Sequence, residues 1–185
     1  MVRSCVAVFL AIVLAALVVA STAGGAERAW HAYLAPGGAC ARSNDPSAAP
    51  RAQRRAITCL VNWARARDRQ SRLSQSQPLH QAAAMKGHGV VSCRQISHTP
   101  CGSDVAASVR RSGYEHARFG ENLYVGTLGS ASARDVVAAW LRSPPHRANI
   151  LDPAFRDVGA ALVRADGVFY DGGALVWIAA FASPR

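Results

Sequence analysis

The chain has 185 residues, of which 50% are hydrophobic, and a formal net charge of +10. This length suits one domain with a hydrophobic core of its own, and the sequence contains no internal repeat and no long low-complexity tract. Lysine and arginine together number 21, and Lys86 is the only lysine. Because the arginines are scattered, the charge indicates a solvated basic surface and no specific nucleic-acid site, although such a surface can also attract anionic lipid or acidic cell-wall polymer.

The N-terminus predicts export. Arg3 supplies a positive charge, residues 6–20 form an uninterrupted apolar run, and the small residues Ser-Thr-Ala follow at 21–23. This order is typical of a secretory signal peptide, and the apolar run is shorter than the roughly 20 residues that span a bilayer. We therefore expect residues 1–25 to be a signal peptide and the protein to be secreted. An uncleaved membrane anchor is the alternative.

The cysteines predict disulfide bonds. Cleavage removes Cys5 and leaves four, which are Cys40, Cys59, Cys93 and Cys101. An even number in an exported chain indicates two bonds, for which three pairings are possible. The short spacing favours Cys93–Cys101, which leaves Cys40–Cys59. A zinc knuckle is the competing interpretation, but no two of these cysteines have the Cys-x-x-Cys spacing that is usual in structural zinc sites.

The first half of the chain predicts a linker followed by helices. Residues 26–50 are rich in Gly, Pro, Ala and Ser without an apolar period, which indicates a leader or linker, ordered at most locally by Cys40. A helix is expected from Arg51 onward, because apolar residues then recur on one helical face. These residues are Ile57, Leu60, Val61 and Ala64. A second helix is expected over residues 78–85, ended by the glycines at 87 and 89.

The second half predicts two further helices and a group of strands. One short helix is expected from residue 103 or 104 to Gly113, and another from its cap at Ser132 to the proline pair 144–145. Strands are expected over residues 122–125, 158–164, 168–170 and 174–182. Because the helices come first and the strands cluster late, the pattern indicates an α+β domain with helices stacked on a small antiparallel sheet.

Three polar residues stand out by their settings. His98 lies between Cys93 and Cys101, Glu121 follows a glycine at the start of the strand expected over 122–125, and His146 follows the proline pair that ends the last helix. A carboxylate in such a place is costly to bury unless it accepts hydrogen bonds. Glu121 is therefore a candidate for a functional site.

These residues lie within recognisable motifs. Residues 119–123 read Phe-Gly-Glu-Asn-Leu, residues 140–151 read Trp-x-x-Ser-Pro-Pro-His-Arg-x-Asn-Ile-Leu, and residues 97–98 read Ser-His. Further matches are residues 60–65 with Asn62 and Arg65, residues 155–159 and residues 177–181. In this order, over about residues 51–183, the motifs resemble those of the CAP family (cysteine-rich secretory protein, antigen 5, pathogenesis-related class one; SCP domain) in its bacterial form.

The resemblance implies a fold and a site. The fold is an α-β-α sandwich with about four helices around a small antiparallel sheet, here a CAP (SCP-like) domain over residues 51–185. The family's shallow cleft holds two histidines and two acids, which by motif places His98, His146 and Glu121 in it. Many eukaryotic members carry the second acid where this chain reads Leu-Arg-Ser at 141–143.

The second acid is therefore missing from its usual place, and Glu115 and Asp152 are the candidates to replace it. Two imidazoles and one carboxylate could hold one zinc-type divalent cation with an open position, so His98, Glu121 and His146 are the expected metal ligands. The alternative is that these groups hydrogen-bond across the cleft and hold helix ends to the sheet.

The resemblance favours a non-enzymatic secreted module that binds a lipid or sterol, or a component of the cell envelope. The alternative is a metal-dependent hydrolase that uses His98, Glu121 and His146, and a third hypothesis is a basic adhesin for anionic surfaces. A nucleophilic pair of Ser143 with His146 is disfavoured, because no Gly-x-Ser-x-Gly elbow surrounds the serine.

Overall fold

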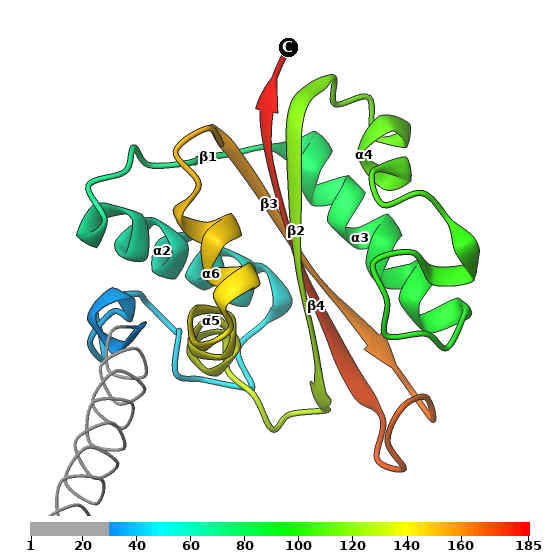
Figure 1. Ribbon diagram of the computed structural model, residues 1–185. Coiled ribbons are helices and arrows are strands. Elements are labelled where there is room, and N and C mark those ends of the chain that lie inside the picture. The colour runs from blue at the N-terminus through cyan, green and yellow to red at the C-terminus, as the bar shows by residue number, and fades with distance from the viewer. Residues whose placement is uncertain (1–29) are drawn as a thin grey trace, which may run out of the picture.

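The computed structural model describes residues 30–185, and Figure 1 shows a central sheet between two groups of helices. The expected signal peptide, residues 1–25, and Cys5 lie outside the described residues. Among the helices described, none combines the length and the apolar character needed to cross a membrane.

Eleven elements follow one another along the chain. They are η1 (Trp30–Tyr33), α2 (Pro50–Arg67), β1 (Ser74–Gln75), α3 (Gln77–Ser92), η2 (Pro100–Gly102), α4 (Ala107–Arg111), β2 (His116–Thr127), α5 (Ala133–Arg142), α6 (Pro144–Leu151), β3 (Asp157–Ala165) and β4 (Ala174–Pro184), where η marks a short 3-10 helix. The helices α2, α5 and α6 lie on one side of the sheet, and α3 and α4 lie on the other (Figure 1). The predicted α+β class and three-layer arrangement are confirmed.

The sheet is mixed, whereas the sequence predicted an antiparallel one. Its strand order is β1-β3-β4-β2. The pairs β2–β4 and β3–β4 are antiparallel, but the short β1 pairs parallel to β3 through Ser74–Asp157 and Gln75–Val158. Two residues are too few to show alternation, so β1 was not predicted. As a result β2 is one edge of the sheet, and β1 with β3 forms the other.

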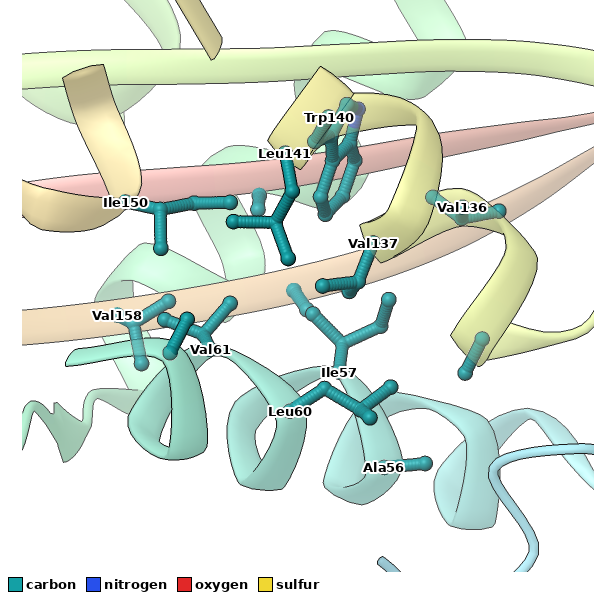
Figure 2. Close-up of a cluster of buried hydrophobic side chains, with 14 of the residues drawn as sticks. Ala56, Ile57, Leu60, Val61, Val136, Val137, Trp140, Leu141, Ile150 and Val158 are labelled. Atoms are coloured by element: carbon teal, nitrogen blue, oxygen red, sulfur yellow. The ribbon is translucent and has the colours of Figure 1, made fainter. Parts of the chain in front are cut away.

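The first core lies between the sheet and the helices α2 and α5. Figure 2 shows Ile57 and Val61 of α2 facing Val137 and Leu141 of α5. Trp140 belongs to the same cluster and is only 1% exposed. The apolar spacing predicted for these two helices thus forms one packed interface, and truncating a side chain of this size in a core costs about 3–5 kcal/mol.

The second core lies on the other side of the sheet, and strand β4 contributes to both. Trp177 and Phe181 of β4 belong to the cluster with α2 and α5, and Ile178 and Ala180 belong to the cluster with α3. Successive side chains of a strand point to opposite faces. Because both faces of β4 are covered by helices, nearly all of its residues are buried.

Helix α3 continues through the two glycines that were expected to end it, and that prediction was wrong. A Cβ placed on Gly87 would lie 2.6 Å from Cγ2 of Val163 on β3. Glycine is present there because the helix lies against the sheet too closely for a larger side chain. Gly87 therefore marks a close approach of the helix backbone to the Val163 side chain and not a helix end.

Three other boundaries differ from the prediction. The proline pair ends α5 as expected, but Pro144 also begins α6, because proline fits the first turn of a helix. Strand β2 spans His116–Thr127 and is longer than the predicted 122–125. Residues 168–170 lie in the connection between β3 and β4 and form no strand, so that prediction was wrong; Phe169 has a φ of 70°, which is incompatible with an extended strand.

The segment before α2 is more ordered than a linker. Trp30, Ala35 and Cys40 are buried in the core that α2 and α5 share, and Arg134 of α5 donates to the carbonyl oxygen of Ala35. The disulfide Cys40–Cys59 joins this segment to α2. Order in residues 30–49 thus extends beyond the neighbourhood of Cys40.

Candidate functional site

The candidate site lies around β2 at the edge of the sheet. Glu121 is on β2, His98 lies in the connection from α3 to η2, and His146 is in the first turn of α6. The predicted disulfide Cys93–Cys101 is present and closes the segment that carries His98. Because β2 has no strand beyond it, groups from both helical layers can reach Glu121 and its neighbour Asn122.

The first contact of the site joins His98 to Glu121. The Nδ1 atom of His98 donates to Oε1 of Glu121 over 2.7 Å. The residue Glu121 is only 6% exposed, whereas the side chain of His98 is 45% exposed. The buried carboxylate therefore holds a partly exposed imidazole in place through one of its two ring nitrogens.

Lys86 makes the second contact with Glu121. Its Nζ lies 3.8 Å from Oε2 of Glu121, and the residue is only 4% exposed. The same ammonium donates to the carbonyl oxygens of His98 and of Val105, the latter over 3.1 Å. A buried carboxylate is tolerated when it is paired and hydrogen-bonded, and Lys86 supplies that pairing while it fixes the backbone at His98.

Sequence reasoning missed Lys86. One signal for it was present, because it is the only lysine among 21 basic residues. Its compact charge on a flexible chain lets one ammonium lie near the Glu121 carboxylate and donate to the carbonyl oxygens of His98 and Val105.

An amide network ties α6 to the other side of β2. Asn122 donates through Nδ2 to the carbonyl oxygen of His146 over 3.0 Å. Asn149 donates through Nδ2 to the carbonyl oxygen of Glu121 over 3.1 Å and to Oδ1 of Asn122 over 2.9 Å. Asn122 and Asn149 were part of the sequence motifs but were not assigned a role. They set the position of His146 relative to Glu121.

His146 is half-buried in the first turn of α6. Burial is the main cause that lowers the pKa of His146 below its ordinary value, and the charge of His98 lowers it further. The carbonyl oxygen of His146 accepts from Asn122, the neighbour of Glu121 on β2, so the start of α6 lies beside this part of the strand. Since an unperturbed histidine titrates near 6.5, His146 is neutral at pH 7.

The candidates for the missing second acid are engaged elsewhere. Asp152 forms an ion pair with Arg118, in which Oδ2 and Nη2 are 2.7 Å apart. Glu115 lines a different cavity with Arg110 and Arg185. In the part of the chain that the structure describes, no hydrogen bond or ion pair connects either acid to His98, Glu121 or His146.

The donor set does not suit a divalent cation as it stands. Within residues 30–185, no three His, Cys, Asp or Glu side chains are grouped as the ligands of one metal ion. The charge of the Glu121 carboxylate is instead balanced by the Lys86 ammonium, which would repel a second cation at the same carboxylate. Metal binding by His98, Glu121 and His146 stays a prediction.

Two residues of the α2 motif have structural roles. The side chain of Asn62 bonds to the backbone of Leu73, with Nδ2 donating over 3.0 Å and Oδ1 accepting over 2.8 Å. Arg65 is fully buried and donates through Nη1 to the carbonyl oxygens of Ile150 and Asp152 over 2.9 and 2.8 Å. Arg65 thereby holds the end of α6 against α2.

Comparisons with known proteins agree with this architecture. A family model described as CAP, the cysteine-rich secretory protein family, matches residues 58–181. Among solved structures, an extracellular protein containing an SCP domain from Bacillus anthracis str. Ames has a TM-score of 0.61 and 19% identity, covering 72% of this chain and 41% of that chain. An outer surface protein from Borrelia burgdorferi has a TM-score of 0.58 and 18% identity, covering 70% of this chain and 90% of that chain.

A third similar structure is a cysteine-rich secretory protein from Staphylococcus aureus subsp. aureus Mu50. Its TM-score is 0.58 and its identity 13%, and the match covers 74% of this chain and 40% of that chain. The match thus spans less than half of the Bacillus and Staphylococcus chains, and at these identities the likeness is one of fold. No curated protein matches the sequence.

Proposed function

Because the chain belongs to the cysteine-rich secretory protein (CAP) family, we propose that it is an exported binding module whose ligand or partner site is centred on His98, Glu121 and His146. The proposal rests on one observation. The buried carboxylate of Glu121 is paired with both His98 and Lys86, so its charge is balanced by the protein itself. The site is then complete without a metal ion.

The exposed chemistry of this site is that of two imidazoles. Glu121 occupies Nδ1 of His98, which leaves Nε2 as the ring nitrogen able to bond to a ligand. The lowered pKa of His146 keeps that ring neutral at pH 7, so it can both donate and accept. Such a pair suits the hydroxyl or headgroup of a lipid or sterol, or a polar group of a cell-envelope component.

Catalysis by a pair of acids has less support. General acid–base chemistry on two carboxylates needs a second acid, and the residues at 141–143 are Leu, Arg and Ser. The remaining carboxylate is paired with a lysine ammonium and hydrogen-bonded to an imidazole. We therefore favour binding over turnover.

A metal-dependent hydrolase using His98, Glu121 and His146 is the second candidate. It is favoured by the lowered pKa of His146, because a metal ion binds the neutral form of an imidazole. It requires a stoichiometric divalent ion and an activity that a chelator abolishes. Elemental analysis of protein purified from its native compartment distinguishes it from the first proposal.

The binding proposal is tested with the mature protein. Labelled lipids, sterol-containing vesicles and cell-envelope fractions would be titrated with the wild type, with a His98→Ala/His146→Ala double variant, and with His88→Ala as a matched control, because His88 is exposed on α3. We expect saturable binding that the control keeps and the double variant weakens at least about tenfold, the equivalent of 1.4 kcal/mol.

Two results would count against the proposal. One is the absence of saturable binding to all of these materials. The other is binding that the double variant retains in full, because the ligand would then lie elsewhere on the protein.

A further inference from the structure

A cavity lies at the opposite edge of the sheet from Glu121. It has a volume of about 340 Å³ and is bounded by the first half of α2, the start of α3, and the edge formed by β1 and β3. Its basic residues are Arg51, Arg54, Arg55 and His80. Small-molecule sites have volumes of about 300–1,000 Å³, so the cavity is large enough for a ligand. It shares no lining residue with the candidate site described above.

The lining of this cavity, which we call the arginine pocket, is positively charged without compensation. Arg51, Arg54 and Arg55 lie on consecutive turns at the start of α2, and no acidic residue lines the cavity. Within residues 30–185, none of the three forms an ion pair.

Within residues 30–185, only Arg42, Arg110, Arg118 and Arg164 form ion pairs with an acid. An unpaired arginine is therefore common on this surface. What distinguishes the arginine pocket is that three arginines line one cavity that no acidic residue lines. Three like charges around one cavity repel one another, and an anion in the cavity would remove that repulsion.

Two polar side chains of the pocket lining are held in place by the fold, and one of them keeps a free donor. The Nδ1 atom of His80 donates to the carbonyl oxygen of Ala160 over 2.6 Å, which covers the edge of β3 where β1 has ended. The hydroxyl oxygen of Ser76 accepts from the backbone N–H of Leu79 over 3.3 Å, so its own hydrogen is free to donate. Ser76 caps α3, and the N-terminus of this 16-residue helix adds a partial positive charge.

The walls of the pocket cannot easily move apart. A Cβ placed on Gly159 would lie 2.2 Å from the backbone nitrogen of His80, so β3 and the first turn of α3 are in direct backbone contact. The hydroxyl of Thr58 donates to the carbonyl oxygen of Arg54 over 3.3 Å. The backbones of β3 and α3 on one side of the pocket are therefore held together before a ligand binds.

We propose that the arginine pocket binds a ligand that carries two or more phosphate groups. The planar guanidinium of arginine matches phosphate oxygens in pairs, and the three positive charges exceed the charge of about −2 that one phosphate group carries. The same chemistry can come from a soluble oligophosphate or from phosphorylated lipid headgroups on a membrane. This function is separate from binding at His98 and His146.

The proposal is tested by titrating the mature protein at near-physiological salt with tripolyphosphate, and in parallel with vesicles that contain a phosphoinositide. The pocket variant is R51Q/R54Q/R55Q. The matched control is R67Q/R72Q/R111Q, which loses the same charge from exposed arginines outside the pocket. A single variant, R55Q, tests the site if the triple variant fails to fold, since Arg55 is exposed and its removal leaves the core intact.

We expect binding that the control retains to within about twofold, that R55Q weakens several-fold, and that the pocket variant weakens at least tenfold. If the pocket variant loses tripolyphosphate binding, the ligand is a soluble oligophosphate. If it loses only vesicle binding, the ligand is a phosphorylated lipid headgroup. Absence of binding to both probes, or equal loss in the two triple variants, overturns the proposal. The H98A/H146A variant should bind both probes normally, so failure here is distinct from failure of the function proposed above.

Discussion

Replacing Lys86 with methionine, which has a similar length and no charge, isolates the role of its ammonium. In the wild type, Lys86 lies 3.8 Å from the Glu121 carboxylate, and both residues are at least nine-tenths buried. Without the ammonium, the carboxylate keeps only its contact with His98, and the carbonyl oxygens of His98 and Val105 each lose a donor. Breaking a buried ion pair by removing one partner costs about 3–5 kcal/mol. We expect K86M to lose that much free energy of unfolding.

The assay is denaturant unfolding with the disulfides intact, applied to a double-mutant cycle of K86M, E121Q and K86M/E121Q. The double variant leaves no buried charge unpaired, so it should be more stable than the sum of the single losses predicts, with a coupling of at least about 1 kcal/mol. Additive losses, or a loss in K86M below about 1 kcal/mol, would refute the argument that Lys86 balances the charge of Glu121.

Three further predictions concern packing, pH and cross-linking. The variant Gly87→Ala should lose about 1–3 kcal/mol in denaturant unfolding, because the added methyl group lies against Val163; an unchanged stability would contradict the close approach of α3 and β3. Because the pKa of His146 is lowered in the folded state, the unfolded chain binds more protons at this residue. The contribution of His146 to stability is therefore present above the unfolded pKa and is lost as pH falls through the folded pKa. The wild type should therefore lose more stability than H146Q between pH 7.5 and pH 5, and parallel curves for the two proteins would exclude this effect. Replacing Cys40 and Cys59 together with alanine should lower the free energy of unfolding by about 3 kcal/mol, the value expected for a loop of this length. Thermal unfolding of the variant at the wild-type temperature would contradict this.

The sequence predicted those parts of the fold that repeat a pattern. The spacing of Ile57, Leu60 and Val61 identified the buried face of α2, and alternation between Trp177 and Ile178 identified a strand with two distinct faces. Both patterns report burial directly, because each side chain position follows from helical or strand geometry.

The parts that the sequence did not predict depend on contacts between distant segments. Gly87 is typical of a helix end when it is considered alone, and only the proximity of β3 explains why the helix continues. The strand β1 is too short for a pattern. Pro144 can end one helix and begin another, and the local sequence does not show that both occur.

The candidate site shows the same division. Motif order placed His98, Glu121 and His146 together, and the structure brings His98 and Glu121 into contact at 2.7 Å. Lys86 was not predicted, because nothing in the sequence around it indicates that its charge is buried against Glu121. The arginine pocket was not predicted either, since it depends on β1 ending at Gln75 and leaving the edge of β3 open.

The most direct test of the account is equilibrium binding of the mature protein to its lipid or envelope ligand, measured with and without a chelator and repeated with H98A/H146A. The account predicts the same affinity in the presence of the chelator and a loss of at least about tenfold in the double variant. Binding that disappears when divalent ions are removed would contradict it, because Glu121 would then depend on a metal ion and not on Lys86.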